Sequence, residues 1–293
     1  MQRSRNLMTR GEKIFQVVNN AIMALLCIIC IYPLWYVLVC SISDPVLLYA
    51  QRGIMVWPLG TWSFRGYRLV MENPNIPIGF RNTLIYMGVG TLINMFLTTT
   101  AAYGLSRKHC YWNGTIMKFI AFTMYFQGGT IPSYIVVESL GLINSRWSMI
   151  LPGAISTFNM IVMRTAMAQV PDSLPESAMI DGASHPQVLF RIMTPLCKAT
   201  VAVIVLYYAV AHWNSWFSAF LYLRDKPKFP LQLILRQILF QEETNSMAAE
   251  SLALDSEAVK YATIVVATVP ILMVYPFLQK YFVKGVMVGA VKG

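Results

Sequence analysis

The residues best suited to covalent or metal chemistry are three histidines and one closely spaced cysteine pair. His109, His185 and His212 are scattered along the chain, and their positions give no credible pair of a nucleophile and its base. Cys27 and Cys30 have the spacing of a redox or metal-binding pair. They lie inside an apolar run, however, where cysteine acts as a small hydrophobic residue. We therefore expect neither a catalytic residue nor a metal site.

Nucleotide chemistry is also missing from the sequence. A phosphate-cradling loop reads Gly-x-x-x-x-Gly-Lys-Ser/Thr, because its backbone N–H groups surround the phosphates. No such stretch occurs in the chain. We therefore expect that the chain binds no cofactor itself and that any energy source resides on another subunit.

One polar stretch, residues 169–197, has the pattern of short helices rather than of a linker. Ser173 followed by Glu176 predicts a capping box, and Pro175 is compatible with a first helical turn. A short helix is therefore expected over residues 174–181.

The next residues predict a turn and a second helix. Gly182 suits the left-handed position that ends a helix, and Ser184 with Pro186 is typical of a new helix start. The expected product is a bent pair of helices lying parallel to a membrane surface.

Composition places this stretch in a membrane protein. Of 293 residues, 56% are hydrophobic and 12% charged, with a mean hydropathy of +0.54, whereas soluble domains carry about 25% charged residues. Apolar runs of roughly 20 residues cross the bilayer as helices, because their backbone groups must pair within the segment. An all-α fold with about six spans is expected, over residues 17–41, 82–105, 115–137, 149–168, 199–221 and 261–282.

The basic residues indicate orientation. The chain has a net charge of +10, and its Lys and Arg concentrate on the side that carries the N-terminus. Both termini are therefore expected in the cytoplasm of a cell whose plasma membrane holds the protein. Because these residues flank apolar spans instead of forming one patch, nucleic-acid binding is not expected.

The spans divide the chain into segments. Residues 1–16 are expected as a cytoplasmic N-terminal segment and residues 17–293 as the transmembrane domain. Residues 42–81 and 222–260 form the two long extracytoplasmic loops. Prolines and glycines indicate turns and short elements in the first loop, and the second holds a predicted short amphipathic helix over Leu231–Phe240.

The run Glu176-Ser177-Ala178-Met179-Ile180-Asp181-Gly182-Ala183, followed by Pro195, resembles the EAA loop of ABC importer permeases. The resemblance covers nearly the whole chain. His212-Trp213-Asn214-Ser215-Trp216-Phe217 looks like carbohydrate importers of the maltose type, in particular the oligosaccharide subgroup of Gram-positive bacteria. Two positions depart from the family pattern, with Ser177 in place of Ala and Thr194 in place of Leu.

The resemblance implies the MetI-like fold of ABC importer permeases and a set of partners. These are a second, related permease subunit, two ATPase subunits that carry ATP and Mg, an extracellular sugar-binding lipoprotein, membrane lipid and an oligosaccharide substrate. The helix pair would dock into a cleft on the ATPase. The coupling residues implied are Glu176, Ser177, Ala178, Asp181, Gly182, Ala183 and Pro195.

A sugar path would be lined by aromatic faces and by amides or hydroxyls. The candidates are Asn94, Tyr125, Gln127, Phe158, Asn159, His212, Trp213, Asn214 and Trp216. Packing or anchoring at the membrane interface is the alternative for each of them.

Two other classes of membrane protein remain as alternatives. An ion-driven secondary transporter of a small solute usually carries charged residues at the membrane midplane, and we see none in these spans. A scaffolding or sensory protein would not need the coupling loop.

Overall fold

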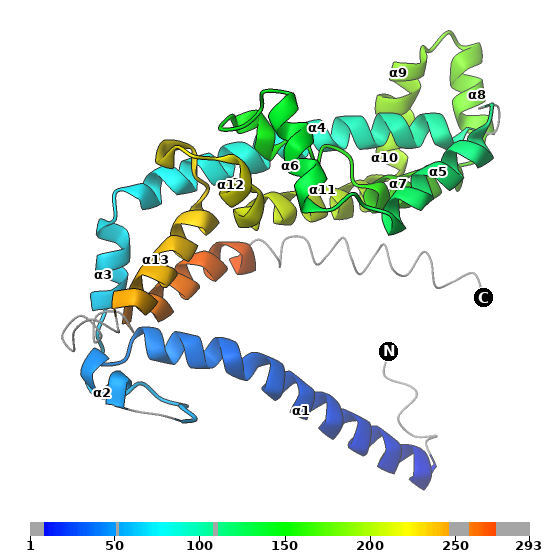
Figure 1. The fold of residues 1–293 in the computed structure, drawn as a ribbon. Helices are drawn as coiled ribbons and strands as arrows, with labels where there is room; N and C mark the ends of the chain where they lie inside the picture. Colours follow the sequence, from blue (N-terminus) through cyan, green and yellow to red (C-terminus); the bar gives the residue numbers. More distant parts are fainter. Residues whose placement is uncertain (1–8, 51–52, 108–110, 246–257, 274–293) are drawn as a thin grey trace. The chain divides into compact units, whose positions relative to one another are not determined.

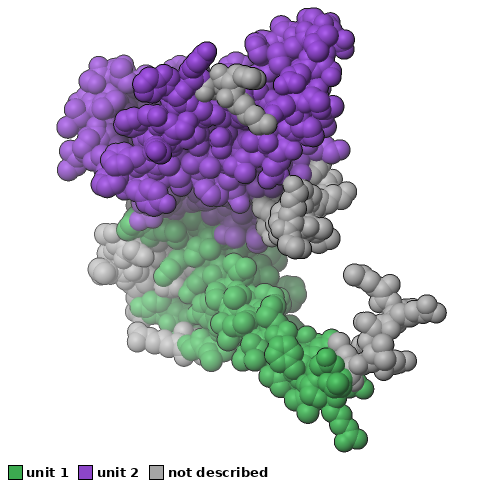
Figure 2. Space-filling view, turned by 90° about the vertical axis from the view of Figure 1, so that its right-hand side faces the viewer, with its two compact units in different colours: residues 1–72, 238–266 green, residues 73–237, 267–293 purple. Residues whose placement is uncertain are grey.

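The computed structural model describes residues 9–50, 53–107, 111–245 and 258–273. All regular elements in these ranges are helical. The chain divides into two compact units, which Figure 2 colours separately: residues 1–72 with 238–266, and residues 73–237 with 267–293. Predictions on residues 1–8, 108–110, 246–257 and 274–293 lie outside the described residues. They include parts of the terminal segments and the end of the sixth span.

The first unit contains α1 (Arg10–Ser41), α2 (Pro45–Ala50) and α3 (Arg65–Glu72). A capping box starts α1: the Thr9 N–H donates to the Glu12 carboxylate, and the Thr9 hydroxyl accepts from the Glu12 N–H. The C-terminal end of α1 packs into a small core formed by Val39, Cys40, Leu48 and Met55. Most of the helix is apolar and exposed, which suits surroundings of lipid or a partner protein.

The second unit is built around α4 (Asn75–Ser106), the long cyan helix in Figure 1. α7 (Thr157–Ala168) and α11 (Lys198–Trp213) both pack along it. The unit also holds α5 (Asn113–Tyr125), α6 (Thr130–Ser139), η1 (Arg146–Met149), α12 (Trp216–Tyr222), η3 (Lys226–Lys228) and the first part of α13 (Leu231–Asn245). Buried residues of α4 recur at every fourth position: Asn82, Tyr86, Gly90, Asn94, Thr98 and Ala102. This spacing forms one continuous face of the helix.

Within the described residues the predicted spans are helical, but three of them are not continuous. α1 and α4 are each long and apolar enough to cross a membrane, and the bent run from His185–Leu196 into α11 is a third candidate. The third predicted run breaks between α5 and α6, where Gly129 takes a φ of 84°. The fourth breaks between η1 and α7, in a segment that contains Pro152 and Gly153. The fifth breaks between α11 and α12.

The two long predicted loops hold more helix than the sequence suggested. α4 begins at Asn75, inside the first predicted loop, because Pro77 in its first turn removes an N–H that has no partner there. A helix is confirmed over Leu231–Phe240 and continues to Asn245. The apolar residues Leu231, Leu233, Ile234, Leu235 and Ile238 are all buried, so α13 belongs to the packed structure.

Gly79 allows α13 to approach α4 closely. A Cβ added at Gly79 would lie 2.4 Å from Ile234 Cδ1 and 3.1 Å from Leu231 Cα. We expect Gly79→Val to lower the free energy of unfolding by roughly 1–3 kcal/mol, because the backbone of α13 would have to move. Thermal unfolding of the purified protein in detergent measures this loss. Gly88→Val, on the same helix with nothing within 4 Å, is the matched control. Equal melting temperatures for the two variants would contradict the prediction.

Candidate functional site

The predicted coupling stretch folds into a helical hairpin. α8 (Ser173–Ile180) is followed by α9 (His185–Gln187), a π-helix (Val188–Met193) and α10 (Thr194–Leu196), and Figure 1 shows α8 and α9 joined by a turn. α8 packs against the π-helix. The bent helix pair predicted from the sequence is therefore present in the structure.

Gly182 ends α8 as predicted, with a φ of +87°. Its N–H donates to Met179 O at 3.0 Å, and the Ala183 N–H donates to Ala178 O at 2.9 Å. These two bonds form a Schellman turn, which needs a left-handed residue at this position.

The start of α8 differs from the prediction. Ser173 is the first helical residue and Asp172 occupies the N-cap position, so the predicted capping box of Ser173 and Glu176 is wrong. The Ser173 carbonyl accepts instead from the Ser177 hydroxyl, one turn later. The predicted helix start lies one residue too late because Asp and Ser are both common N-cap residues.

The second helix begins at His185, and Ser184 is its N-cap, in agreement with the predicted restart at Ser184 and Pro186. Both the N–H and the hydroxyl of Ser184 donate to Gln187 Oε1, at 2.8 and 3.0 Å. The whole run His185–Leu196 then meets α11 at a bend of 91°. Pro195 and Cys197 lie at this corner, where a proline cannot continue the helical hydrogen bonding.

One side of the hairpin is anchored in the core of the second unit, and the other side is free. Val188, Leu189 and Met193 are buried against Met163 and Met167 of α7, with Ala178, Met179 and Ala183 partly buried beside them. In contrast, Ile180 is 86% exposed, and Glu176, Ser177, Asp181 and Gly182 are exposed as well.

Polar contacts tie the hairpin to the C-terminal end of α4. The Tyr103 hydroxyl lies 3.1 Å from His185 Nδ1. The Arg107 guanidinium lies 5.4 Å from the centre of the Tyr103 ring and 3.8 Å from the Asp172 carboxylate. It also donates to Met167 O of α7. The hairpin is therefore held by α4 and α7 together.

A polar seam joins α4 to α11 in the middle of the second unit. Asn94 Nδ2 lies 3.3 Å from His212 Nε2, and the hydroxyls of Thr98 and Tyr208 lie 2.7 Å apart. Gly90 makes room for the imidazole, because a Cβ there would lie 2.4 Å from His212 Nε2. Bonds between helices satisfy polar groups that would be costly to leave unpaired in a bilayer.

The seam opens into a pocket of about 620 Å³. The Ser156 N–H, at the N-cap of α7, donates to the Tyr208 hydroxyl at 2.9 Å and closes one wall. Of the candidates predicted for a sugar path, the structure brings four together here: Asn94, Phe158, Asn159 and His212. They come from α4, α7 and α11, which are far apart in the sequence.

The other five candidates do not line this pocket. Tyr125 is 83% exposed at the end of α5, and Gln127 is exposed in the break that follows. Trp213 is buried beside Phe80, and Asn214 bonds to the carbonyl of Val210. The Arg236 guanidinium lies 3.7 Å from the centre of the Trp216 ring. Trp213 and Trp216 therefore pack within the protein.

Sequence reasoning missed several lining residues. Ser133, Ser148, Ser156, Tyr207, Ser215, Ser218 and Tyr222 all face the pocket. Tyr207 was detectable in principle, since it precedes Tyr208 on an apolar helix. The serines carry no signal of their own, because small polar residues are common at helix interfaces in membranes.

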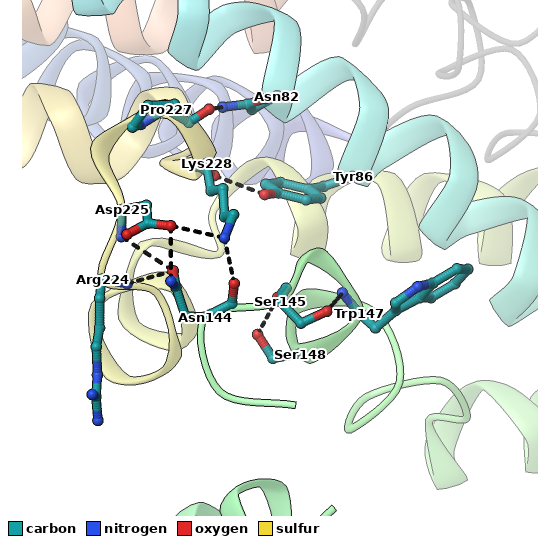
Figure 3. Close-up of polar contacts among 10 residues, drawn as sticks. All are labelled: Asn82, Tyr86, Asn144, Ser145, Trp147, Ser148, Arg224, Asp225, Pro227 and Lys228. Carbon is teal, nitrogen blue, oxygen red and sulfur yellow. Dashed lines mark hydrogen bonds and ion pairs between the residues drawn. The ribbon is translucent and has the colours of Figure 1, made fainter. Parts of the chain in front are cut away.

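A third polar cluster, centred on Asn144, joins the segment before η1 to the segment after α12 (Figure 3). Asn144 Oδ1 accepts from the N–H groups of Arg224 and Asp225, and its Nδ2 donates to the Asp225 carboxylate at 2.8 Å. Lys228 Nζ donates to Asn144 O at 2.7 Å and to Asp225 at 2.8 Å. We call these four residues the Asn144 clamp.

The clamp is fixed to α4 by two further side chains (Figure 3). Asn82 Nδ2 donates to the carbonyls of Pro227 and Phe229, and the Tyr86 hydroxyl donates to Lys228 O at 2.7 Å. The buried amide and hydroxyl groups therefore each have a hydrogen-bond partner, as is usual for buried polar groups in native proteins. The clamp, the pocket and the hairpin thus all rest on α4.

Comparisons with known proteins show the family to which the chain belongs. No family model matches the chain. It is 38% identical over 288 residues to Protein LplC of Bacillus subtilis, covering 97% of each chain. It is 37% identical to the polygalacturonan/rhamnogalacturonan transport system permease protein YtcP of the same organism, covering 96% of this chain and 99% of that one.

A solved structure shows the same fold. It is a bacterial ABC transporter involved in the import of the acidic polysaccharide alginate, with a TM-score of 0.85 and 30% identity. The match covers 94% of this chain and 99% of the other. The fold is thus that of a polytopic membrane protein, an ABC importer permease. By its relatives, this chain belongs to the carbohydrate ABC transporter permeases and is the transmembrane subunit of a sugar importer.

Replacing Asn144 should loosen the clamp. Asn144 has a φ of 58°, which asparagine tolerates better than alanine. Asn144→Gly removes only the side-chain bonds and should lower the local stability of residues 222–230 by roughly 1–3 kcal/mol. Asn144→Ala should lose about 1 kcal/mol more, because it adds backbone strain. Native-state hydrogen exchange over these residues measures both effects. Exchange as slow as in the wild type would contradict the prediction.

The clamp should also open in acid. Hydrogen bonds from Lys228 and Asn144, with the charge of Lys228, hold the pKa of Asp225 below its ordinary value. The ionised carboxylate is thus favoured in the folded clamp. Its contribution is complete above the ordinary pKa of about 4 and is lost as pH falls through the lower folded pKa. Hydrogen exchange of residues 222–230, corrected for intrinsic rates, should accelerate below about pH 4. Asp225→Asn should remove this acceleration.

Proposed function

We propose that this subunit forms half of the translocation path for an oligosaccharide and that a second, related permease forms the other half. The observation that carries the proposal is the α8–α10 hairpin, anchored on one side and exposed on the other. Two ATPase subunits would each dock on such a hairpin, one per permease. The path itself would pass the pocket at the α4–α11 seam.

The exposed side of the hairpin suits a protein partner. Ile180 presents an apolar side chain, and Gly182 leaves its neighbourhood open for a partner's backbone, since a Cβ at this position would meet nothing within 4 Å. Glu176 and Asp181 add carboxylates that a basic surface would complement. ATP and Mg bind to that partner in this proposal, and this chain transmits the closure of the partner to α11.

The opposite end of the α4 face suits a different partner. The Asn144 clamp joins two connecting segments, 140–145 and 223–230, and leads into α13. An extracellular sugar-binding lipoprotein docking on residues 222–237 would act on a segment that is fixed to α4 rather than on a loose loop. In this proposal the protein lies in the plasma membrane with both chain termini in the cytoplasm and the clamp outside the cell.

The substrates named for the relatives indicate the saccharide class. YtcP is described as transporting polygalacturonan and rhamnogalacturonan, and the solved relative imports the acidic polysaccharide alginate. We place the substrate of this chain among oligosaccharide fragments of polysaccharides. The relatives do not favour the ion-driven secondary transporter.

Charging the exposed tip of the hairpin tests ATPase docking. Ile180→Asp should abolish co-purification of the ATPase subunits, or lower it at least tenfold, because a desolvated charge would replace an apolar contact. Its side chain contacts little of its own chain, so the permease should still fold. Gly182→Asp should uncouple transport in the same way, with added strain at φ +87°.

Leu174→Asp is the matched control, since Leu174 lies on the same helix and is 46% exposed. It separates the effect of a new charge on α8 from a specific contact at Ile180. Normal co-purification and transport-linked ATP hydrolysis in the Ile180→Asp complex would refute the docking assignment.

A further inference from the structure

The pocket at the seam contains a buried hydrogen-bond acceptor that the protein leaves unsatisfied. Asn94 is 1% exposed, and its Nδ2 is engaged with His212. Its Oδ1 has no hydrogen-bond partner. Among the described residues, a few other buried side-chain atoms also lack a hydrogen-bond partner, but only Asn94 Oδ1 belongs to a residue that lines the pocket. Buried polar atoms in native proteins are rarely left without a partner unless a ligand or water supplies one.

The orientation of this amide is fixed by its surroundings. With Nδ2 donating to His212 Nε2, the amide presents Oδ1 away from the imidazole. Gly90 one turn earlier leaves the imidazole no room to turn toward α4. The Thr98 hydroxyl one turn later lies 2.7 Å from the Tyr208 hydroxyl and is engaged there. The acceptor is therefore preorganised rather than free to find a partner within the protein.

The remaining walls combine aromatic rings with small hydroxyls. The rings of Phe158 and Tyr207 lie 6.3 Å apart, tilted by 42°. Phe158 is 52% exposed and Tyr207 40% exposed, and both line the pocket. Ser133, Ser148 and Ser218 add hydroxyls. This mixture suits a sugar ring, which presents C–H faces to aromatic rings and hydroxyls to polar groups.

Charge is absent from this lining. None of the described residues around the pocket is Asp, Glu, Lys or Arg. Moving an ionised carboxylate from water into such a site is strongly unfavourable unless a cation meets it. A neutral, hydroxyl-bearing ring meets no such penalty. The volume of about 620 Å³ lies within the range of small-molecule sites, roughly 300–1,000 Å³.

We infer that this pocket is a subsite that binds one uncharged face of a sugar ring, and that a hydroxyl of the sugar donates a hydrogen bond to Asn94 Oδ1. Any carboxylates of the transported oligosaccharide lie outside it. This inference rests on the proposed function and deepens it. It names the hydrogen-bond acceptor that this subunit contributes to sugar binding, and it states that charged groups of the substrate are excluded from the pocket.

The test uses the full importer reconstituted in nanodiscs with its binding protein. Saccharide-stimulated ATP hydrolysis is measured with trigalacturonate, maltotriose, raffinose and arabinotriose as probes. For each saccharide that stimulates the wild type, Asn94→Leu should lower kcat/KM by roughly tenfold or more, because the acceptor is lost.

Two further variants keep the test independent of the Asn94–His212 bond. Ala211→Phe fills the pocket without removing a hydrogen bond and should reduce the same responses. Asn214→Leu is the matched control, since Asn214 lies two residues beyond His212, its side-chain amide donates to Val210 O, and it does not line the pocket. It should behave as the wild type.

A separate variant tests whether charged groups of the substrate are excluded from the pocket. Ser218→Asp puts an anion on the pocket wall and should lower the responses to neutral and acidic saccharides alike, because no substrate carboxylate lies in the pocket. A selective loss of the trigalacturonate response would overturn the inference. Wild-type kcat/KM in both Asn94→Leu and Ala211→Phe would also overturn it and leave the proposed function intact. A wild-type complex that responds to none of the four saccharides would count against the proposed function as well.

Discussion

One face of α4 supports every site in the second unit. Polar side chains of a helix inside a bilayer favour partners within the protein, and the polar residues of the buried face of α4 each bond to another element. Asn82 and Tyr86 hold the Asn144 clamp, Asn94 and Thr98 form the seam with α11, and Tyr103 reaches the hairpin. Three distant sites are thereby joined to one rigid element.

The hairpin was largely predictable from the sequence because its geometry is local. The Schellman turn at Gly182 depends on residues within five positions of each other, and the restart at Ser184 depends on Gln187 alone. The error at Ser173 was one of register, since two neighbouring residues both suited the N-cap. Local hydrogen bonding leaves a signal in a single sequence.

The pocket and the clamp were not predictable in the same way. Asn94 and His212 meet across 118 positions of sequence, and Asn144 meets Asp225 across 81. Amides and aromatic residues near the expected depth were easy to name, but only four of the nine named candidates share this pocket. Gln127 lies in the break between α5 and α6, and Trp216 follows the break between α11 and α12; neither residue lines the pocket.

The right-angle corner at Cys197 determines how a force on the hairpin would act on α11. A load applied along the run His185–Leu196 acts across the axis of α11, because the two directions differ by 91°. Such a load swings α11 like a lever instead of compressing its hydrogen bonds. His212 lies fifteen residues further along that arm, roughly 22 Å away at 1.5 Å per residue. A small swivel at the corner therefore produces its largest displacement where α11 borders the pocket.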